Sequence, residues 1–291
     1  MELDLTEPIL ELIRLTSTDL PMPVEKRLRA ALGKEEPGSA AYGALETILK
    51  NVEMTRKNST PICQDTGTPI FYVHHPAGVN TGTLLIQIRA AVALATKRAY
   101  LRPNAVHPIT GKNTGNNVGD DHFPSIYFTQ VEGETITIDL MLKGGGCENV
   151  GRQYSLPDDR LGAGRDLEGV RKAVLDAVYQ AQGEGCSPGF LGVAIGGDRG
   201  TSYAASKEAL LRNLDDSNTD ITLDELENRI TAESNQLGIG PMGFGGRATV
   251  LGTKIVSTHR LPASFFVSVS YMCWAYRRRK MIVTGTEIAY E

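Results

Sequence analysis

The stretch STPICQDTGTPIFYV, residues 59–73, marks the change from a helical part of the chain to a mixed part. A loop that contains a proline carries Cys63, Gln64, Asp65 and Thr66, and it leads into the apolar run PIFYV, which predicts a β-strand. Loops at the ends of strands are frequent places for binding and catalytic side chains. The thiol, amide, carboxylate and hydroxyl of this loop are therefore the first candidate site.

Helical patterns flank the loop on both sides. Apolar residues recur at helical spacing in EPILELIRL (7–15) and AAYGALETILKNVEMTRK (40–57) before it. After it, TLLIQIRAAVALATKRAYL (83–101) predicts a long helix, whose final cations suit the negative end of a helix dipole. The first part of the chain is thus a set of packing helices.

The rest of the chain combines strand and helix patterns. The segment PSIYFTQVEGETITIDLMLKGGG (124–146) alternates over two runs and predicts a β-hairpin with Gly133 in its turn. A helix is expected over 166–181, with Asp166 as N-cap and Gly183 as its stop. Further expected elements are a buried strand over 189–197, a helix opened by Thr201 or Ser202, a helix over 223–237, and two or three strands over 248–283.

No repeat and no low-complexity linker interrupts this order. We therefore predict an α+β fold: a helical N-terminal part packed with a mixed or antiparallel sheet region, as a single compact unit over residues 1–291.

Composition excludes several classes of protein. The chain has 291 residues, a net charge of -4 and a pI near 5.8, which disfavours a nucleic-acid partner despite the basic run YRRRK (276–280). It lacks the run of about 18 to 20 apolar residues that spans a membrane. Its start, MELDLTEPILELIRL, lacks the order of a secretion signal. A globular cytoplasmic protein is expected.

The four cysteines are far apart in the sequence, at positions 63, 147, 186 and 273, and none forms a C-x-x-C pair. In a reducing compartment they are thiols or metal ligands, although isolated buried cysteines are often only small apolar residues. The five histidines form no H-E-x-x-H pattern, and no G-x-S-x-G elbow supports a serine nucleophile.

Loops rich in glycine are candidate anion sites. KGGGCEN (143–149), IGGDRGT (195–201) and GPMGFGG (240–246) could direct backbone N–H groups at an anion, or could simply be tight turns. None matches a phosphate-binding nucleotide motif. In the polar loop 101–117, Arg102 has the forked geometry that suits a carboxylate, unless it is an ordinary surface cation.

Together, the motifs PICQDTGT, KNTGNN, KGGGCEN, GCSPGFLGVAIGG, LGIGPMGFGG and PASFFVSVSYMCWAYRR resemble one enzyme family. This is the α subunit, or N-terminal region, of the class I iron-sulfur fumarate hydratases and the related L(+)-tartrate dehydratases. The motifs occur in the family's order over roughly residues 60 to 280.

The resemblance implies a 4Fe-4S cluster held by Cys63, Cys186 and Cys273, with one iron left open as a Lewis acid. Cys147, where relatives often have serine, is excluded from the ligands.

The resemblance also implies roles for the residues around the cluster. Gln64 is expected to donate a hydrogen bond to the substrate, and Asp65 to act as an acid that handles water, although Asp65 could instead only close the turn. Arg102 is expected to bind a substrate carboxylate, and Gly145 and Gly146 to supply N–H donors.

One substrate-binding position departs from the family pattern. Many fumarate hydratases have a histidine where Leu261 stands here, so His259 could serve only if the loop is rebuilt.

The expected activity is the reversible hydration of fumarate to (S)-malate, with L(+)-tartrate dehydration to oxaloacetate as the runner-up. Because the chain ends at Glu291, without the segment expected to provide the base, a separate β subunit in an α2β2 assembly is implied. Two other classes stay open: a redox or iron sensor that uses the cluster, and a binding module for dicarboxylates without a metal.

Overall fold

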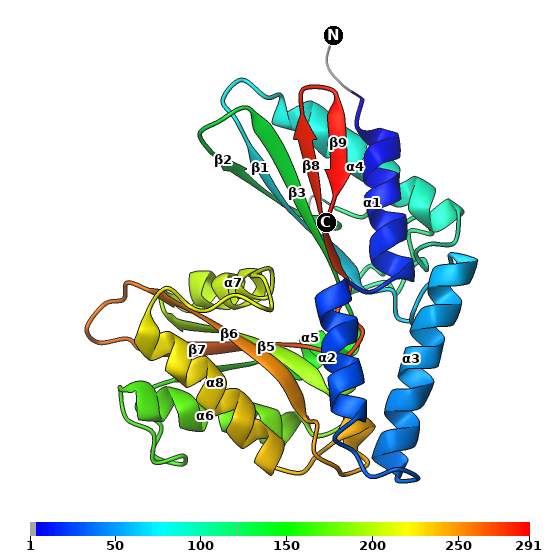
Figure 1. Cartoon of the computed structure of the whole chain (residues 1–291). Coiled ribbons are helices and arrows are strands. Elements are labelled where there is room, and N and C mark those ends of the chain that lie inside the picture. The colour runs from blue at the N-terminus through cyan, green and yellow to red at the C-terminus, as the bar shows by residue number, and fades with distance from the viewer. Residues whose placement is uncertain (1–3, 121) are drawn as a thin grey trace. The chain divides into compact units, whose positions relative to one another are not determined.

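The computed structural model describes residues 4–120 and 122–291, and Figure 1 shows their helices and strands. The predicted α+β class is confirmed, since helices pack on two mixed sheets. The described residues divide into two compact units: unit 1 contains those within 1–21, 50–145 and 277–291, and unit 2 contains residues 22–49 and 146–276. Because each unit is built from separate segments, no linker in the sequence marks the division.

Unit 1 is a five-stranded sheet with helices against it. The strand order is β2-β1-β3-β8-β9, in which β1 and β2 are parallel and the other neighbours are antiparallel. Its elements are α1 (Thr6–Thr18), β1 (Thr68–His75), α4 (Thr81–Lys97), β2 (Ser125–Gln130), β3 (Thr135–Lys143), β8 (Arg278–Thr284) and β9 (Glu287–Tyr290). Helices α1 and α4 pack together and share one apolar core with β1, β3 and β8.

The predicted hairpin over residues 124–146 is wrong. Its two runs are strands, β2 and β3, but β1 lies between them: Phe71 pairs with Ile126 on one side and with Leu140 on the other. The residues around Gly133 therefore cross the end of β1, where the Val131 N–H donates to the His75 carbonyl at 2.9 Å. Alternation within one segment predicts strands, but it cannot detect a third strand inserted from earlier in the chain.

Unit 2 is a four-stranded sheet between two helical layers. The strand order is β4-β7-β5-β6, with β5 and β6 parallel. Its elements are α2 (Met22–Leu32), β4 (Arg152–Ser155), α6 (Leu167–Ala181), β5 (Gly189–Gly196), α7 (Arg199–Ala209), α8 (Ile221–Gln236), the short helix η1 (Pro241–Gly243), β6 (Val250–Thr258) and β7 (Phe266–Met272). Helices α6 and α8 cover one face of the sheet and α7 covers the other (Figure 1).

Two helices contain residues of both units. Helix α3 (Ala40–Asn58) has residues in both units, and the short helix α5 (Gly145–Asn149) starts at the last residue of a unit 1 segment.

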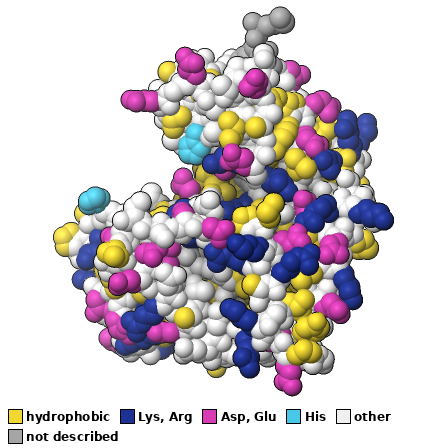
Figure 2. Space-filling view, viewed as in Figure 1, with side chains coloured by type: hydrophobic (Ala, Val, Ile, Leu, Met, Phe, Trp, Pro, Cys, Tyr) yellow, Lys and Arg dark blue, Asp and Glu magenta, His cyan; other side chains and the backbone are white. Residues whose placement is uncertain are grey.

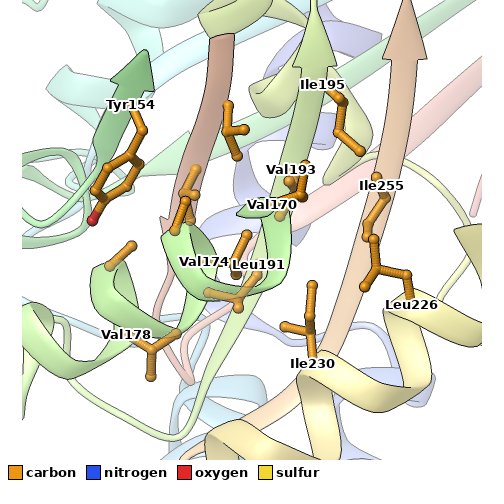
Figure 3. Close-up of a cluster of buried hydrophobic side chains, with 14 of the residues drawn as sticks. Tyr154, Val170, Val174, Val178, Leu191, Val193, Ile195, Leu226, Ile230 and Ile255 are labelled. Atoms are coloured by element: carbon orange, nitrogen blue, oxygen red, sulfur yellow. The ribbon is translucent and has the colours of Figure 1, made fainter. Parts of the chain in front are cut away.

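Strand β5 lies at the centre of unit 2, and all its residues are buried. Figure 3 shows Leu191, Val193 and Ile195 directed at the apolar sides of α6 and α8. Burying each such side chain stabilises the fold by roughly 1.5–3 kcal/mol. A strand covered on both faces reads as a continuous apolar run, which is why GFLGVAIGG was predictable.

The N-cap predicted for α6 is confirmed, and the start predicted for α7 is wrong. The Asp166 side chain caps α6 by accepting from the Gly169 N–H at 2.7 Å, as predicted, and the helix ends before Gly183. Helix α7 does not open at Thr201 or Ser202. It begins at Arg199 because Asp198 is the N-cap and accepts from the N–H groups of Gly200 and Thr201.

Surface charge and helix length agree with the composition. On the face drawn in Figure 2, lysine and arginine side chains are interspersed with aspartate and glutamate. Across residues 4–120 and 122–291, no helix combines the length and the apolar character that crossing a bilayer requires.

Candidate active site

The loop before β1 is anchored at Ile62, the residue directly before Cys63. The Ile62 N–H donates to the Ser17 carbonyl at 2.9 Å, and the Asn51 amide donates to the Ile62 carbonyl at 2.9 Å. Ile62 itself is buried. Cys63 and Asp65 are half-buried and Gln64 is exposed, so this anchored loop presents its polar groups toward solvent.

Asp65 is held at its carboxylate and at its carbonyl. The Gly67 N–H donates to Oδ1 at 3.0 Å, and the Gly145 N–H donates to Oδ2 at 2.8 Å. The carbonyl oxygen accepts from Arg277 Nη1 at 2.6 Å. Asp65 does close the D-T-G turn, and the same contacts fix the direction of its carboxylate.

Two glycines make this arrangement possible. Gly67 has a φ of +80°, and a Cβ atom there would lie 2.8 Å from the backbone of Lys143 on the neighbouring strand. A Cβ atom on Gly144 would lie 2.9 Å from Asp65 Oδ2. The turn around Asp65 and the glycine loop therefore approach each other at a distance that only glycine permits.

Arg102 is tied to the same loop. Its backbone N–H donates to Thr66 Oγ1 at 3.1 Å, and its Nη1 donates to the Gln64 carbonyl at 3.2 Å. The buried Thr66 hydroxyl also accepts from the Asn104 amide at 3.2 Å. The guanidinium keeps further donors and is exposed, so it can still bind a carboxylate.

Asn117 supports Arg102 and is not a residue that the sequence singles out. It is almost completely buried, has a φ of +59°, and its Oδ1 accepts from the N–H groups of Asn104 and Ala105 at 2.6 and 3.1 Å. Its amide donates to the Arg102 carbonyl at 2.6 Å and to Thr96 Oγ1 at 3.0 Å. The run KNTGNN contains this asparagine, but nothing in the sequence distinguishes it from its exposed neighbours.

These groups line a pocket in unit 1 with a volume of about 370 Å³, which we name the Asp65 pocket. Its lining residues are Gln64, Asp65, Gly67, Thr68, Arg102, Asn104, Phe123 and Gly145. A cation, an amide and a fixed carboxylate converge here, as binding and proton transfer on a small carboxylic acid require. The structure thus brings together four predicted site residues.

Three thiols gather in unit 2 around Tyr271, and we name this set the thiol region. The Cys273 N–H lies 3.3 Å from Cys147 Sγ, and the Trp274 N–H donates to the Cys186 carbonyl at 3.3 Å. Burial raises the pKa of Tyr271 far above its ordinary value, and Cys273, Cys147 and Cys186 raise it further. Two of the three predicted cluster ligands therefore lie in one region.

The thiol chemistry fits a cluster. None of the four cysteines is in a disulfide, and Cys186 has a φ of +54°, a conformation rare for a residue with a side chain. In the described parts of the chain, no three His, Cys, Asp or Glu side chains could hold one metal ion. A cubane cluster needs a wider arrangement of ligands, because each thiolate binds its own iron atom. That Cys63 of unit 1 meets the other two sulfurs stays a prediction.

The remaining predicted residues have other surroundings. The Gly145 N–H, expected to donate to a substrate, donates to Asp65 in this structure. Gly146 is exposed at the start of the next unit 2 segment. His259 is exposed in unit 2, where it lines a different, open pocket with Gly196 and Arg260. The substrate contacts of these residues stay predictions.

Comparison with known proteins gives consistent matches. A family model described as fumarate hydratase (Fumerase) matches residues 6–282. "Putative fumarate hydratase class I" of Geobacillus stearothermophilus is 50% identical over 277 residues, which are 94% of this chain and 54% of that protein. This chain therefore spans about half the length of that relative.

Two further relatives are named as subunits. "Putative L(+)-tartrate dehydratase subunit alpha" of Methanocaldococcus jannaschii is 33% identical over 94% of this chain and 95% of its own length. The L(+)-tartrate dehydratase subunit alpha of Escherichia coli K12 is 32% identical over 96% of this chain and 90% of its own length.

Proposed function

This chain belongs to the fumarate hydratase (Fumerase) family, and we propose that it is the α part of a hydro-lyase that interconverts fumarate and (S)-malate. The observation that carries the proposal is the Asp65 pocket, where one fixed carboxylate lies beside a cation and an amide. Hydration of fumarate adds one water molecule across its double bond, and the reverse reaction removes it.

The residues of the pocket can divide this work between them. Arg102 keeps exposed donors for a substrate carboxylate, and the exposed Gln64 amide can donate to a second oxygen. Asp65 is the acid that we assign to the water that leaves or arrives, because its carboxylate is the one acidic group among the described residues that line the pocket. Gly146 and His259 complete the proposed binding set from unit 2.

We propose that Cys63, Cys186 and Cys273 hold a 4Fe-4S cluster. When bound, such a cluster supplies a Lewis acid for the oxygen atoms of a hydroxy acid. Cys147, whose sulfur lies 3.3 Å from the Cys273 N–H, is a neighbour of the ligand set and not a member of it.

The complete enzyme includes a second part that supplies the base. The Geobacillus relative is about twice as long as the match, and the tartrate dehydratase relatives are named as alpha subunits, which imply a partner. We therefore propose a β partner, in an α2β2 assembly, or an equivalent second region. The cytoplasm is the proposed compartment, because four thiols stay reduced there.

L(+)-tartrate is the second candidate substrate. Both relatives named as subunits above carry that name, and tartrate differs from malate by a single hydroxyl group. Removal of water from tartrate gives oxaloacetate, so the same acid and the same carboxylate-binding groups would serve. The residues of the Asp65 pocket do not distinguish the two acids.

The test is anaerobic purification of the chain with its β partner, followed by iron and sulfide analysis and assays with fumarate, (S)-malate and L(+)-tartrate. Replacing Asp65 by asparagine should reduce turnover about 10²–10⁴-fold while the cluster content is unchanged. The matched control is Asp158→Asn in unit 2, where Oδ1 accepts from the Leu161 N–H at 3.2 Å in a turn.

Each alternative predicts a different outcome. A cluster with no hydro-lyase activity would favour a sensor, and dicarboxylate binding after a failed reconstitution would favour a module without metal. Full turnover in Asp65→Asn would refute the acid assignment.

A further inference from the structure

Arg277 is a buried arginine inside the motif PASFFVSVSYMCWAYRR, which by itself gives this residue no role. Its exposed fraction is 1%, and it immediately precedes β8. Its carbonyl accepts from the Leu142 N–H at 3.0 Å, which fixes its backbone beside β3. Charged side chains are rarely buried this completely unless they have a defined partner.

The guanidinium of Arg277 is directed at Asp65 and the glycine turn. Nη1 donates to the Asp65 carbonyl at 2.6 Å. Nη2 lies 3.6 Å from the position that a Cβ atom on Gly144 would occupy, and Asp65 Oδ2 lies 2.9 Å from that position. Among the described residues, Nε has no hydrogen-bond partner, and Arg277 forms no ion pair with a carboxylate.

Burying a guanidinium with so few contacts destabilises the folded state. It has five N–H donors, and the transfer of a charge out of water is unfavourable unless hydrogen bonds and an opposite charge compensate. General packing does not explain its place, because an apolar side chain of similar volume would avoid this desolvation. A local role at the residue it contacts does explain it.

That residue is Asp65, which is then held at three points. The Gly67 and Gly145 N–H groups fix the two carboxylate oxygens, and Arg277 fixes the carbonyl at the other end of the residue. Rotation of the peptide that follows Asp65 would break the Arg277 contact. The guanidinium therefore opposes the motion that would turn the carboxylate away from the Asp65 pocket.

We propose that Arg277 is a positioning residue that fixes the orientation of Asp65 through its carbonyl oxygen. Arg277 does not line the Asp65 pocket, so it acts on Asp65 and not on the substrate. The catalytic consequence rests on the proposed function, whereas the structural consequence does not. The two can be tested separately.

The structural test measures amide hydrogen exchange by NMR in the chain without its cofactor. In Arg277→Met, the N–H groups of Gly67 and Gly145 should exchange about tenfold faster, because their acceptor is less fixed, while β1 and β3 amides change little. Arg277→Lys should restore most of the protection, since one donor is enough for the single contact with the carbonyl. Uniformly faster exchange in unit 1, or no change at the two glycines, would overturn the proposal.

The matched control is Arg89→Met. Within residues 4–120 and 122–291, Arg89 also bonds only backbone carbonyls, those of Asp120 at 2.9 Å and Gly119 at 2.7 Å. Its removal should leave the exchange of Gly67 and Gly145 unchanged.

The catalytic test is a double-mutant cycle in the complete, reconstituted enzyme. Arg277→Met should lower kcat about tenfold with KM changed less than threefold, and it should have no further effect in the Asp65→Asn background. Additive losses would show that Arg277 does not act through Asp65. If Asp65→Asn alone has no effect, the proposed function fails while the exchange result still decides the role of Arg277.

Discussion

The Asp65 pocket of unit 1 and the thiol region of unit 2 hold reactive groups by different means. Backbone N–H groups and Arg277 fix the half-buried Asp65, and the exposed Arg102 remains open to solvent. In the thiol region, packing takes this role: Cys147 and Cys273 are buried, and a Cβ atom on Gly185 would lie 2.6 Å from the Tyr271 ring. An acid needs access and a fixed direction, whereas thiols that hold a cluster need positions fixed by the side chains around them.

The largest effect is expected from loss of a sulfur in the thiol region. Cys273→Ala removes one of the three proposed ligands, so cluster content after anaerobic reconstitution should fall to background and turnover should be lost. Iron and sulfide analysis measures the loss.

Cys147→Ser is the control for that substitution. A serine hydroxyl can accept from the Cys273 N–H in place of the sulfur, so this variant should keep its cluster. Equal loss in the two variants would show that packing around Tyr271, and not ligation, decides cluster content.

A single methyl group added at Gly67 should strongly disturb the turn that holds Asp65. Gly67→Ala would place a Cβ atom 2.8 Å from the Lys143 backbone at a φ of +80°, and should lower the free energy of unfolding by about 3 kcal/mol. Gly78→Ala is the matched control: it has a φ of +84° with no atom near its added Cβ, so it should cost only about 1 kcal/mol. Equal losses in urea unfolding would mean that the contact between Gly67 and β3 is not tight.

Asn117→Ala should have a smaller effect on stability and on KM, because Asn117 holds the backbone of Arg102 in place. It removes four hydrogen bonds from a buried site, and we expect a loss of about 2 kcal/mol of stability and a several-fold rise in KM. Asn113→Ala is the control in the same loop, because Asn113 is exposed although it too bonds the backbone. A change in kcat without a change in KM would argue against a role in placing Arg102.

The fold was predictable where a pattern is local. The buried run of β5, the apolar faces of α1 and α6 and the Asp166 cap all follow from neighbours in the sequence. The insertion of β1 between β2 and β3, and the division into units built from separate segments, depend on residues distant in sequence. No local pattern encodes such pairings.

The candidate site shows the same limit. Gln64, Asp65 and Arg102 carry reactive groups, so chemistry singles them out, and the family motifs bring in Gly145. Asn117 and Arg277 also lie inside quoted motifs, but their role is not visible there, because it comes from carbonyls that the fold brings to them. Supporting residues of this kind become visible only when the hydrogen bonds are known.

The smallest expected effects concern the pH dependence of stability. One aspartate in each unit should change the free energy of unfolding, and the two changes should have opposite signs. In unit 2, burial alone would raise the pKa of Asp176, but hydrogen bonds from Arg160 and Tyr154 outweigh it and lower that pKa. In unit 1, burial raises the pKa of Asp139 more than Lys280, 3.7 Å away, lowers it. Asp176 therefore stabilises the folded state above its ordinary pKa and loses this as pH falls, whereas ionised Asp139 opposes folding as pH rises.

The matched pair Asp176→Asn and Asp139→Asn tests this sign. Near neutral pH, Asp176→Asn should lower the free energy of unfolding and Asp139→Asn should raise it, each by less than about 1 kcal/mol. Both differences should shrink in urea unfolding at about pH 3, below the ordinary aspartate pKa. Asp139 is then largely protonated, and Asp176 is largely protonated in the unfolded chain, which reduces the stability that its lowered pKa contributes. If the two variants shift stability in the same direction at neutral pH, the contrast between a paired carboxylate in unit 2 and a desolvated one in unit 1 does not hold.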